Sequence, residues 1–152
     1  MANSVDTTAS SSRPRYGNPT FDCGGAQVRA QSRPLATVVT ITGAIDAMNV
    51  EGITEYSRHF VLPDQPIVLD LSGVERLAVQ GARFLYRIDD ACRAADVGWA
   101  LVASPVVTRA LRTSDDESAF PLVDSVHQAL RCFADVITAR RRMLLPLFTK
   151  TA

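Results

Sequence analysis

The chain has 152 residues, 47% of them hydrophobic, with 16 basic and 16 acidic side chains, so its formal net charge is zero. This length and composition predict one globular domain with a buried core, and the charge balance argues against a general electrostatic grip on nucleic acid or an anionic membrane. Three widely spaced cysteines and two histidines form no disulfide or zinc pattern, and no basic leader or apolar run of about 18 residues is present, which together favour a cytoplasmic protein without a membrane span.

Residues 1–20 are rich in serine and threonine and poor in apolar side chains, a composition that predicts a disordered tail. The tail is either a solvated leader without a role or a regulatory segment whose hydroxyls accept phosphate. We favour the leader, because composition alone carries no kinase signature. The candidate phosphate acceptors are Thr7, Thr8 and Ser10.

The middle of the chain alternates between strand-like and helix-like patterns. Apolar and β-branched runs predict strands over residues 24–31, 36–42, 66–71 and 97–102. Apolar residues recurring every three or four positions predict helices that begin after residues 46–49, at residue 81, at 104–105 and at 124–125. The alternation predicts a single α/β domain with a mixed, mostly parallel sheet of about four or five strands and about four helices.

Side chains that accept hydrogen bonds stand before three of these helices. Asp46 or Asn49 is expected to cap the first helix, and Asp124 or Ser125 the last. Ser104 precedes a proline, which is favoured in the first turn of a helix, and that helix is expected to stop near residue 113.

Residues 66–93 organise the rest of the sequence. The run 66–71 has the composition of a central strand that is covered on both faces. In the helix that follows, Gly81, Leu85, Ile88 and Cys92 fall on one side and predict its buried stripe. The connection between strand and helix presents a helix N-terminus with free N–H groups at the surface, so the functional site is expected there.

Two further patterns frame this stretch: residues 38–46 read V-V-T-I-T-G-A-I-D, and residues 67–74 read I-V-L-D-L-S-G-V. With the segments at 99–105 and 120–130, they resemble the STAS domain of bacterial anti-sigma factor antagonists, over roughly residues 24–137. The sequence departs from the family pattern at one point. Where the family has D-S-(S/T)-G, this chain has A-V-Q-G at residues 78–81, so neither serine position carries a hydroxyl.

The resemblance implies a function in bacterial transcription regulation and stress response. In the family, the unmodified antagonist binds an anti-sigma factor with a histidine-kinase-like ATPase fold and so frees a sigma factor, and phosphorylation of the serine stops this binding. The altered loop cannot accept phosphate, which predicts a permanently binding-competent antagonist. The residues expected to bind the partner are Asp46, Leu77, Ala78, Val79, Gln80, Gly81 and Ala82.

Other functions stay open at this point. The altered loop also suits a STAS adaptor or scaffold that binds a different protein, although we favour the antagonist, and a small nucleotide-binding α/β protein is a remote third alternative. The sequence contains no G-x-x-x-x-G-K-(S/T), G-x-S-x-G or H-E-x-x-H motif, so we expect neither an enzyme nor a bound cofactor or metal.

The thiols and the C-terminal end carry weaker signals. Cys92 and Cys132 are expected to be buried where their helices pack on the rest of the domain. This leaves Cys23 as the more reactive thiol. Beyond a domain at residues 21–139, residues 140–152 form a basic and then apolar extension, in which Pro146 is expected to break the helix. We expect the apolar run to pack on the domain or on a second copy in a homodimer, in preference to settling on a membrane surface.

Overall fold

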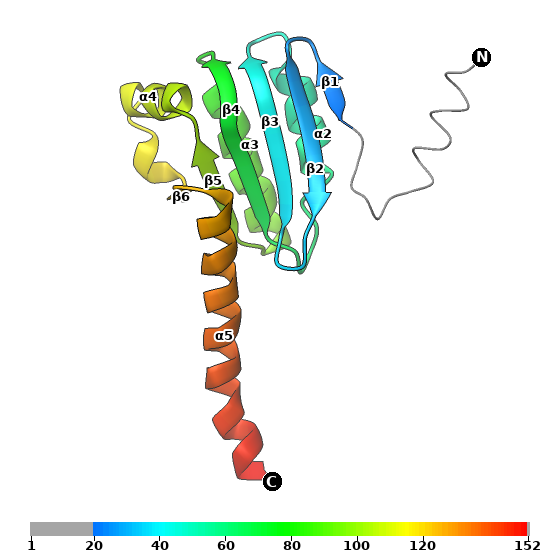
Figure 1. Ribbon diagram of the computed structural model, residues 1–152, viewed down its shortest axis with the longest axis vertical. Helices are drawn as coiled ribbons and strands as arrows, with labels where there is room; N and C mark the ends of the chain where they lie inside the picture. Colours follow the sequence, from blue (N-terminus) through cyan, green and yellow to red (C-terminus); the bar gives the residue numbers. More distant parts are fainter. Residues whose placement is uncertain (1–19, 152) are drawn as a thin grey trace, which may run out of the picture.

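A six-stranded sheet forms the centre of the molecule, and its strand order follows the chain from β1 to β6 (Figure 1). The computed structural model describes residues 20–151, with side chains up to residue 143. The predicted tail, with Thr7, Thr8 and Ser10, lies outside the described residues. The strands are β1 (Phe21–Cys23), β2 (Ala26–Ser32), β3 (Thr37–Ile45), β4 (Ile67–Leu77), β5 (Trp99–Ala103) and β6 (Leu122–Val123).

The sheet is mixed. β2 pairs antiparallel with both β1 and β3, whereas β3, β4, β5 and β6 run parallel to one another. The predicted α/β fold with a mixed, mostly parallel sheet is therefore confirmed. β1 was not expected, because a segment of three residues is too short to show a strand pattern. β6 lies within residues 120–130, the segment that resembles the last strand and helix of the family.

Helices cover the two faces of this sheet unequally. The helices are α2 (Val50–Arg58), α3 (Gly81–Ala95), α4 (Pro105–Thr113) and α5 (Val126–Thr151), with a short 3-10 turn (Glu117–Ala119) after α4. α2 and α3 lie along one face (Figure 1), where Ile53, Leu85 and Ile88 pack against the inward side chains of β2 to β5. The start of α5 packs through Ala129 on the other face.

The central strand has the burial that its composition predicts. Ile67 and Leu69 point into the core beneath α2 and α3, and Val68 between them points to the face that α5 covers. All three side chains are at most 2% exposed. Burial on both faces explains why this run is uniformly apolar and not alternating.

Two of the predicted helix caps are confirmed. The Ser104 hydroxyl accepts a hydrogen bond from the Val107 amide at 3.2 Å, and α4 ends at residue 113 as expected. The Ser125 hydroxyl accepts from the Gln128 amide at 3.1 Å at the start of α5. Each hydroxyl satisfies a backbone donor that has no partner within its helix.

The last helix extends beyond the sheet, which corrects two expectations. α5 runs through Pro146 to residue 151, although proline has no amide hydrogen to donate within a helix. Figure 1 shows the second half of α5 pointing away from the domain. Met143 is 75% exposed, so the prediction that the extension packs on the domain is wrong for this residue. The side chains of residues 144–148 lie outside those described. Within residues 20–151, no helix is both long and apolar enough to cross a membrane.

Candidate partner-binding site

The loop after β4 lies at the edge of the sheet where the parallel strands end. β4 ends at Leu77 and α3 begins at Gly81. The Ala78 amide donates a hydrogen bond of 2.9 Å to the Ile45 carbonyl, at the end of β3. This bond holds the loop beside the turn that begins at Asp46. The structure therefore brings the predicted residues 46 and 77–82 together at one edge.

The start of α3 has little local support, as the missing acid predicts. Gln80 occupies the N-cap position, and its side chain makes no capping hydrogen bond to any residue of the described chain. The first turn is closed by backbone bonds, from the Gly81 amide to the Ala78 carbonyl at 2.8 Å and from the Arg83 amide to the Gln80 carbonyl at 3.1 Å. The helix therefore begins without the side-chain acceptor that usually stabilises such an end.

Gly81 is the one residue of the family's loop pattern that this chain keeps, and packing explains why. Its position is buried, and a Cβ placed there would lie 2.1 Å from Leu77 Cδ1 and 2.8 Å from Leu77 Cγ. Those separations are far below van der Waals contact. A glycine therefore lets the end of β4 and the first turn of α3 approach each other closely.

Asp46 shapes the neighbouring turn, which corrects the prediction that it or Asn49 caps α2 with its side chain. The Asp46 carboxylate accepts hydrogen bonds from the amides of Met48 at 2.9 Å and Asn49 at 3.0 Å, both of which precede the helix. Asn49 stands at the N-cap, but its amide group donates to the carbonyls of Cys23, Gly24 and Ala44 at 2.8–3.0 Å. Asp46 thus bonds within the turn, and Asn49 bonds mainly to carbonyls of the distant β1–β2 connection, so neither side chain caps the helix.

Two apolar side chains project from this edge into solvent. Val79 in the loop is 90% exposed, and Met48 in the neighbouring turn is 93% exposed. Both side chains are thus available for contact with another protein. Met48 was not among the predicted site residues, because nothing in the sequence distinguishes a methionine in a turn from one in the core.

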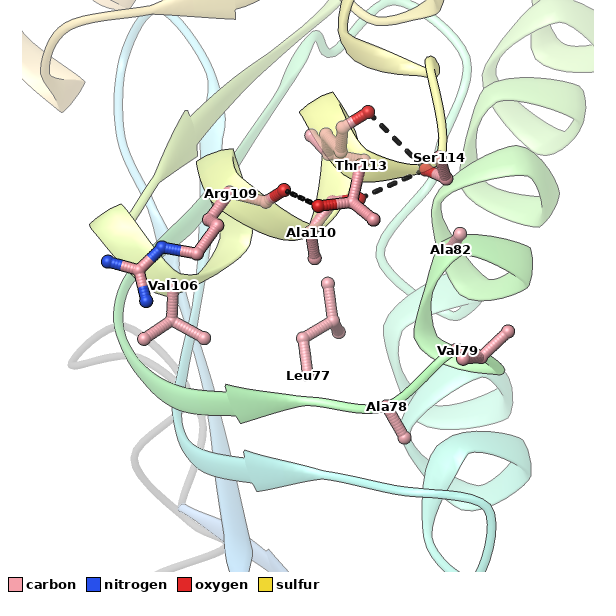
Figure 2. Close-up of a pocket in the computed structure, with 10 residues that line it drawn as sticks. Leu77, Ala78, Val79, Ala82, Val106, Arg109, Ala110, Thr113 and Ser114 are labelled. Carbon is pink, nitrogen blue, oxygen red and sulfur yellow. Dashed lines mark hydrogen bonds between the residues drawn. The ribbon is translucent and has the colours of Figure 1, made fainter.

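A cavity of about 310 Å³ opens between this loop and α4 (Figure 2). Its walls are predominantly apolar, and Arg109 stands at one side of its mouth. The lining residues are Leu77, Ala78, Val79, Ala82, Val106, Arg109, Ala110, Leu111, Thr113 and Ser114. The four from the loop and α3 were predicted as partner-binding residues, but the six from α4 and its end were not. α4 lies about thirty positions further along the chain, and only the tertiary fold places it beside the loop.

One hydrogen bond joins α3 to the segment that follows α4. The Tyr86 hydroxyl donates to the Asp116 carboxylate at 2.6 Å. This bond, followed by a second from Ser114, lowers the pKa of the Asp116 carboxyl, and the same Tyr86–Asp116 bond raises the pKa of the Tyr86 hydroxyl. The contact connects the two elements on either side of the cavity.

The thiols lie away from the cavity lining. Cys92 is buried, as predicted, and burial raises the pKa of its thiol to about 12. Cys132 is exposed on α5, so the expectation that it packs inside is wrong, because that helix turns this residue away from the sheet. Burial, followed by the charges of Asp22 and Asp46, raises the pKa of the Cys23 thiol.

Comparisons with known proteins agree with this architecture. A family model described as the STAS domain matches residues 27–129. Osmosensory protein A of Mycobacterium tuberculosis is 50% identical over 142 residues, which cover 91% of this chain and 90% of that protein.

Solved structures share the fold at low sequence identity. An anti-sigma factor antagonist from Mycobacterium paratuberculosis has a TM-score of 0.63 at 23% identity, over 72% of this chain and 94% of that one. The anti-sigma factor antagonist SpoIIAA in its unphosphorylated form has a TM-score of 0.55 at 13% identity, over 75% of this chain and 96% of that one. By the extent of the family match and the identity to its relative, the chain belongs to the STAS domain family.

Proposed function

We propose that the protein is an anti-sigma factor antagonist, which binds an anti-sigma factor through the edge formed by residues 46–49 and 77–82 and so frees a sigma factor. Support comes from membership of the STAS domain family and from a fold shared with two proteins described as anti-sigma factor antagonists. The protein acts by binding and not by catalysis.

The observation that carries the proposal is the exposed apolar side chain of Val79 at the start of α3. A valine that is 90% exposed beside an equally exposed Met48 is stabilised when a partner removes both from water. The loop also offers hydrogen-bond donors, because the amides of Val79 and Gln80 have no acceptor among the residues described. A partner carbonyl or carboxylate can satisfy them.

The same loop has no hydroxyl for a kinase to modify, since residues 78–80 are alanine, valine and glutamine. Phosphate would add nearly two negative charges at the centre of this surface. An antagonist with this loop stays in its binding form whenever it is present. The extent to which it frees the sigma factor is then set by the concentration of the protein or by another part of the chain.

A second reading has a specific observation in its favour, namely the loss of the family's polar loop pattern. In that reading the domain is an adaptor that has exchanged the kinase-fold partner for another protein. The name of the relative, Osmosensory protein A, supports a role in the response to osmotic change under either reading.

The test is a titration of the full-length protein against each anti-sigma factor of its source organism, with and without ATP. We expect binding that ATP does not reverse, weakened at least about tenfold by Val79→Asp and weakened also by Gln80→Glu. Val136→Asp is the matched control, because Val136 is a half-exposed valine on α5, away from this edge. Absence of binding to every anti-sigma factor would refute the antagonist function and leave the adaptor.

A further inference from the structure

Two of the three residues that replace the family's phosphorylation motif are among those that line the cavity beside the loop. Ala78 and Val79 stand where the pattern has an acid and a serine, and both line the cavity opposite Val106 and Ala110 of α4 (Figure 2). An acid and a hydroxyl at these positions would make this wall polar. The substitutions that remove the phosphorylation site therefore also make this part of the cavity wall apolar.

The interior of the cavity offers almost no free hydrogen-bond donor. The two hydroxyls in its lining have acceptors of their own segment within reach: Thr113 Oγ1 donates to the Arg109 carbonyl at 2.9 Å, and Ser114 Oγ lies 3.1 Å from the Ala110 carbonyl and also reaches the Asp116 carboxylate. The Arg109 guanidinium, by contrast, stands exposed at the mouth. Such a site fits an occupant with an apolar body, and it places any negative charge outside.

Exposed arginines without an ion pair occur at the mouth and on either side of the loop in the sequence. Arg76 and Arg83 flank the loop in the chain and are exposed, and together with Arg109 they take part in no ion pair among residues 20–143. Of the acidic groups after α4, Asp116 accepts from Tyr86 and keeps its negative charge, whereas Glu117 pairs with Arg112. Among residues 20–143, Arg109 therefore offers a guanidinium group without an ion pair at the mouth of the cavity.

We propose that this cavity receives one apolar side chain of the anti-sigma factor, carried on an acidic segment with a carboxylate that lies against Arg109. This inference rests on the proposed function and names the chemistry of its partner. A volume of about 310 Å³ is at the small end of the range for ligand pockets, about 300–1,000 Å³, which suits a single leucine, methionine or phenylalanine side chain. A buried apolar anchor with a charged rim is the usual form of an energetic hot spot.

The cavity therefore selects the partner. An anti-sigma factor that presents a polar or basic segment at this point would leave the cavity empty or place like charges together. The departure from the family loop then restricts the chain to an anti-sigma factor with a matching apolar and acidic segment.

The decisive variants fill the cavity or remove or reverse the positive charge at its rim. Ala110→Leu places a larger side chain inside it, and Ala82→Leu does so from α3, in case the first variant fails to fold. We expect each to weaken binding of the anti-sigma factor about tenfold or more. Arg109→Gln should weaken binding about two- to fivefold, and Arg109→Glu more, with the difference shrinking at high salt.

Two controls carry the same chemical changes elsewhere. Ala139→Leu lies on the exposed part of α5, and Arg29→Gln lies on β2 at a position turned to solvent. Both should bind like the wild type. If the wild type binds an anti-sigma factor and the cavity variants bind equally well, the inference is wrong while the proposed function stands.

A peptide experiment tests the cavity without any anti-sigma factor. The ¹H–¹⁵N spectrum of the full chain is recorded with Ac-Asp-Glu-Leu-Asp-NH₂, with the same peptide carrying alanine for leucine, and with Ac-Asn-Gln-Leu-Asn-NH₂. We expect saturable shifts of the amides of residues 77–82 and 106–114 with the first peptide, and weaker ones with the other two. Equal shifts with all three peptides, or shifts elsewhere, would contradict the inference.

Discussion

The Tyr86 hydroxyl donates a hydrogen bond of 2.6 Å to the Asp116 carboxylate, which joins α3 to the segment after α4. The two residues are thirty positions apart, and the elements that they connect form the two sides of the cavity. The contact therefore fixes the distance between the two elements that flank the cavity.

Tyr86→Phe should raise the pKa of Asp116 toward the ordinary aspartate value, because the donor that stabilises the ionised carboxylate is removed. In the wild type this pKa is lowered by folding, so the pair stabilises the folded state above the ordinary pKa and loses this effect as the pH falls through the lowered one. The measurement is an NMR titration of the Asp116 side-chain carbon. An unchanged pKa in the variant would show that the bond is absent in solution.

Gly81→Ala should destabilise the protein and displace Leu77. The new methyl group would lie 2.1 Å from Leu77 Cδ1, and relief of such overpacking typically costs about 1–3 kcal/mol. Chemical denaturation measures the change in the free energy of unfolding. Gly98→Ala is the control, since a Cβ there would meet only Phe133 at 3.4 Å. Equal stability of the two variants would rule out the close approach of β4 and α3.

Asn49→Ala should cost about 2–3 kcal/mol of unfolding free energy, because one buried amide group serves the carbonyls of Cys23, Gly24 and Ala44. Asn49→Asp should also destabilise, since a carboxylate cannot donate to these carbonyls. The exposed Gln31→Ala on β2 serves as control, with a change within about 0.5 kcal/mol. A small effect of both Asn49 variants would mean that this residue does not tie the turn to the sheet.

The thiols should react with a disulfide reagent at very different rates. At pH 8 a thiol with a pKa of about 12 is ionised in about one molecule in 10,000, so Cys92 should react only when the protein opens. Exposed Cys132 should react first, and Cys132→Ser should remove that fast phase. Fast modification of two thiols in the Cys132→Ser variant would contradict the burial of Cys92.

The local patterns of the sequence determined the α/β class, the long strands, the starts of α3 and α4 and the buried stripe of α3 through Gly81, Leu85, Ile88 and Cys92. These features depend on the spacing of apolar residues and on caps within a few positions, which a linear sequence records directly. The absence of a hydroxyl in the loop and its apolar character were likewise readable without a structure.

Only the tertiary structure decided how the site is completed. In the folded protein, Asp46 and Asn49 support a turn and do not cap a helix with their side chains. Met48 is exposed, and Arg109 and Ala110 of α4 lie against the loop. The tertiary structure also carried α5 past the edge of the sheet, so that the stripe which packs through Ala129 leaves Val136 half-exposed. Apart from the local hydrogen bonds of Asp46, these outcomes depend on contacts between residues far apart in the chain, and a local pattern does not specify which distant surface a side chain will meet.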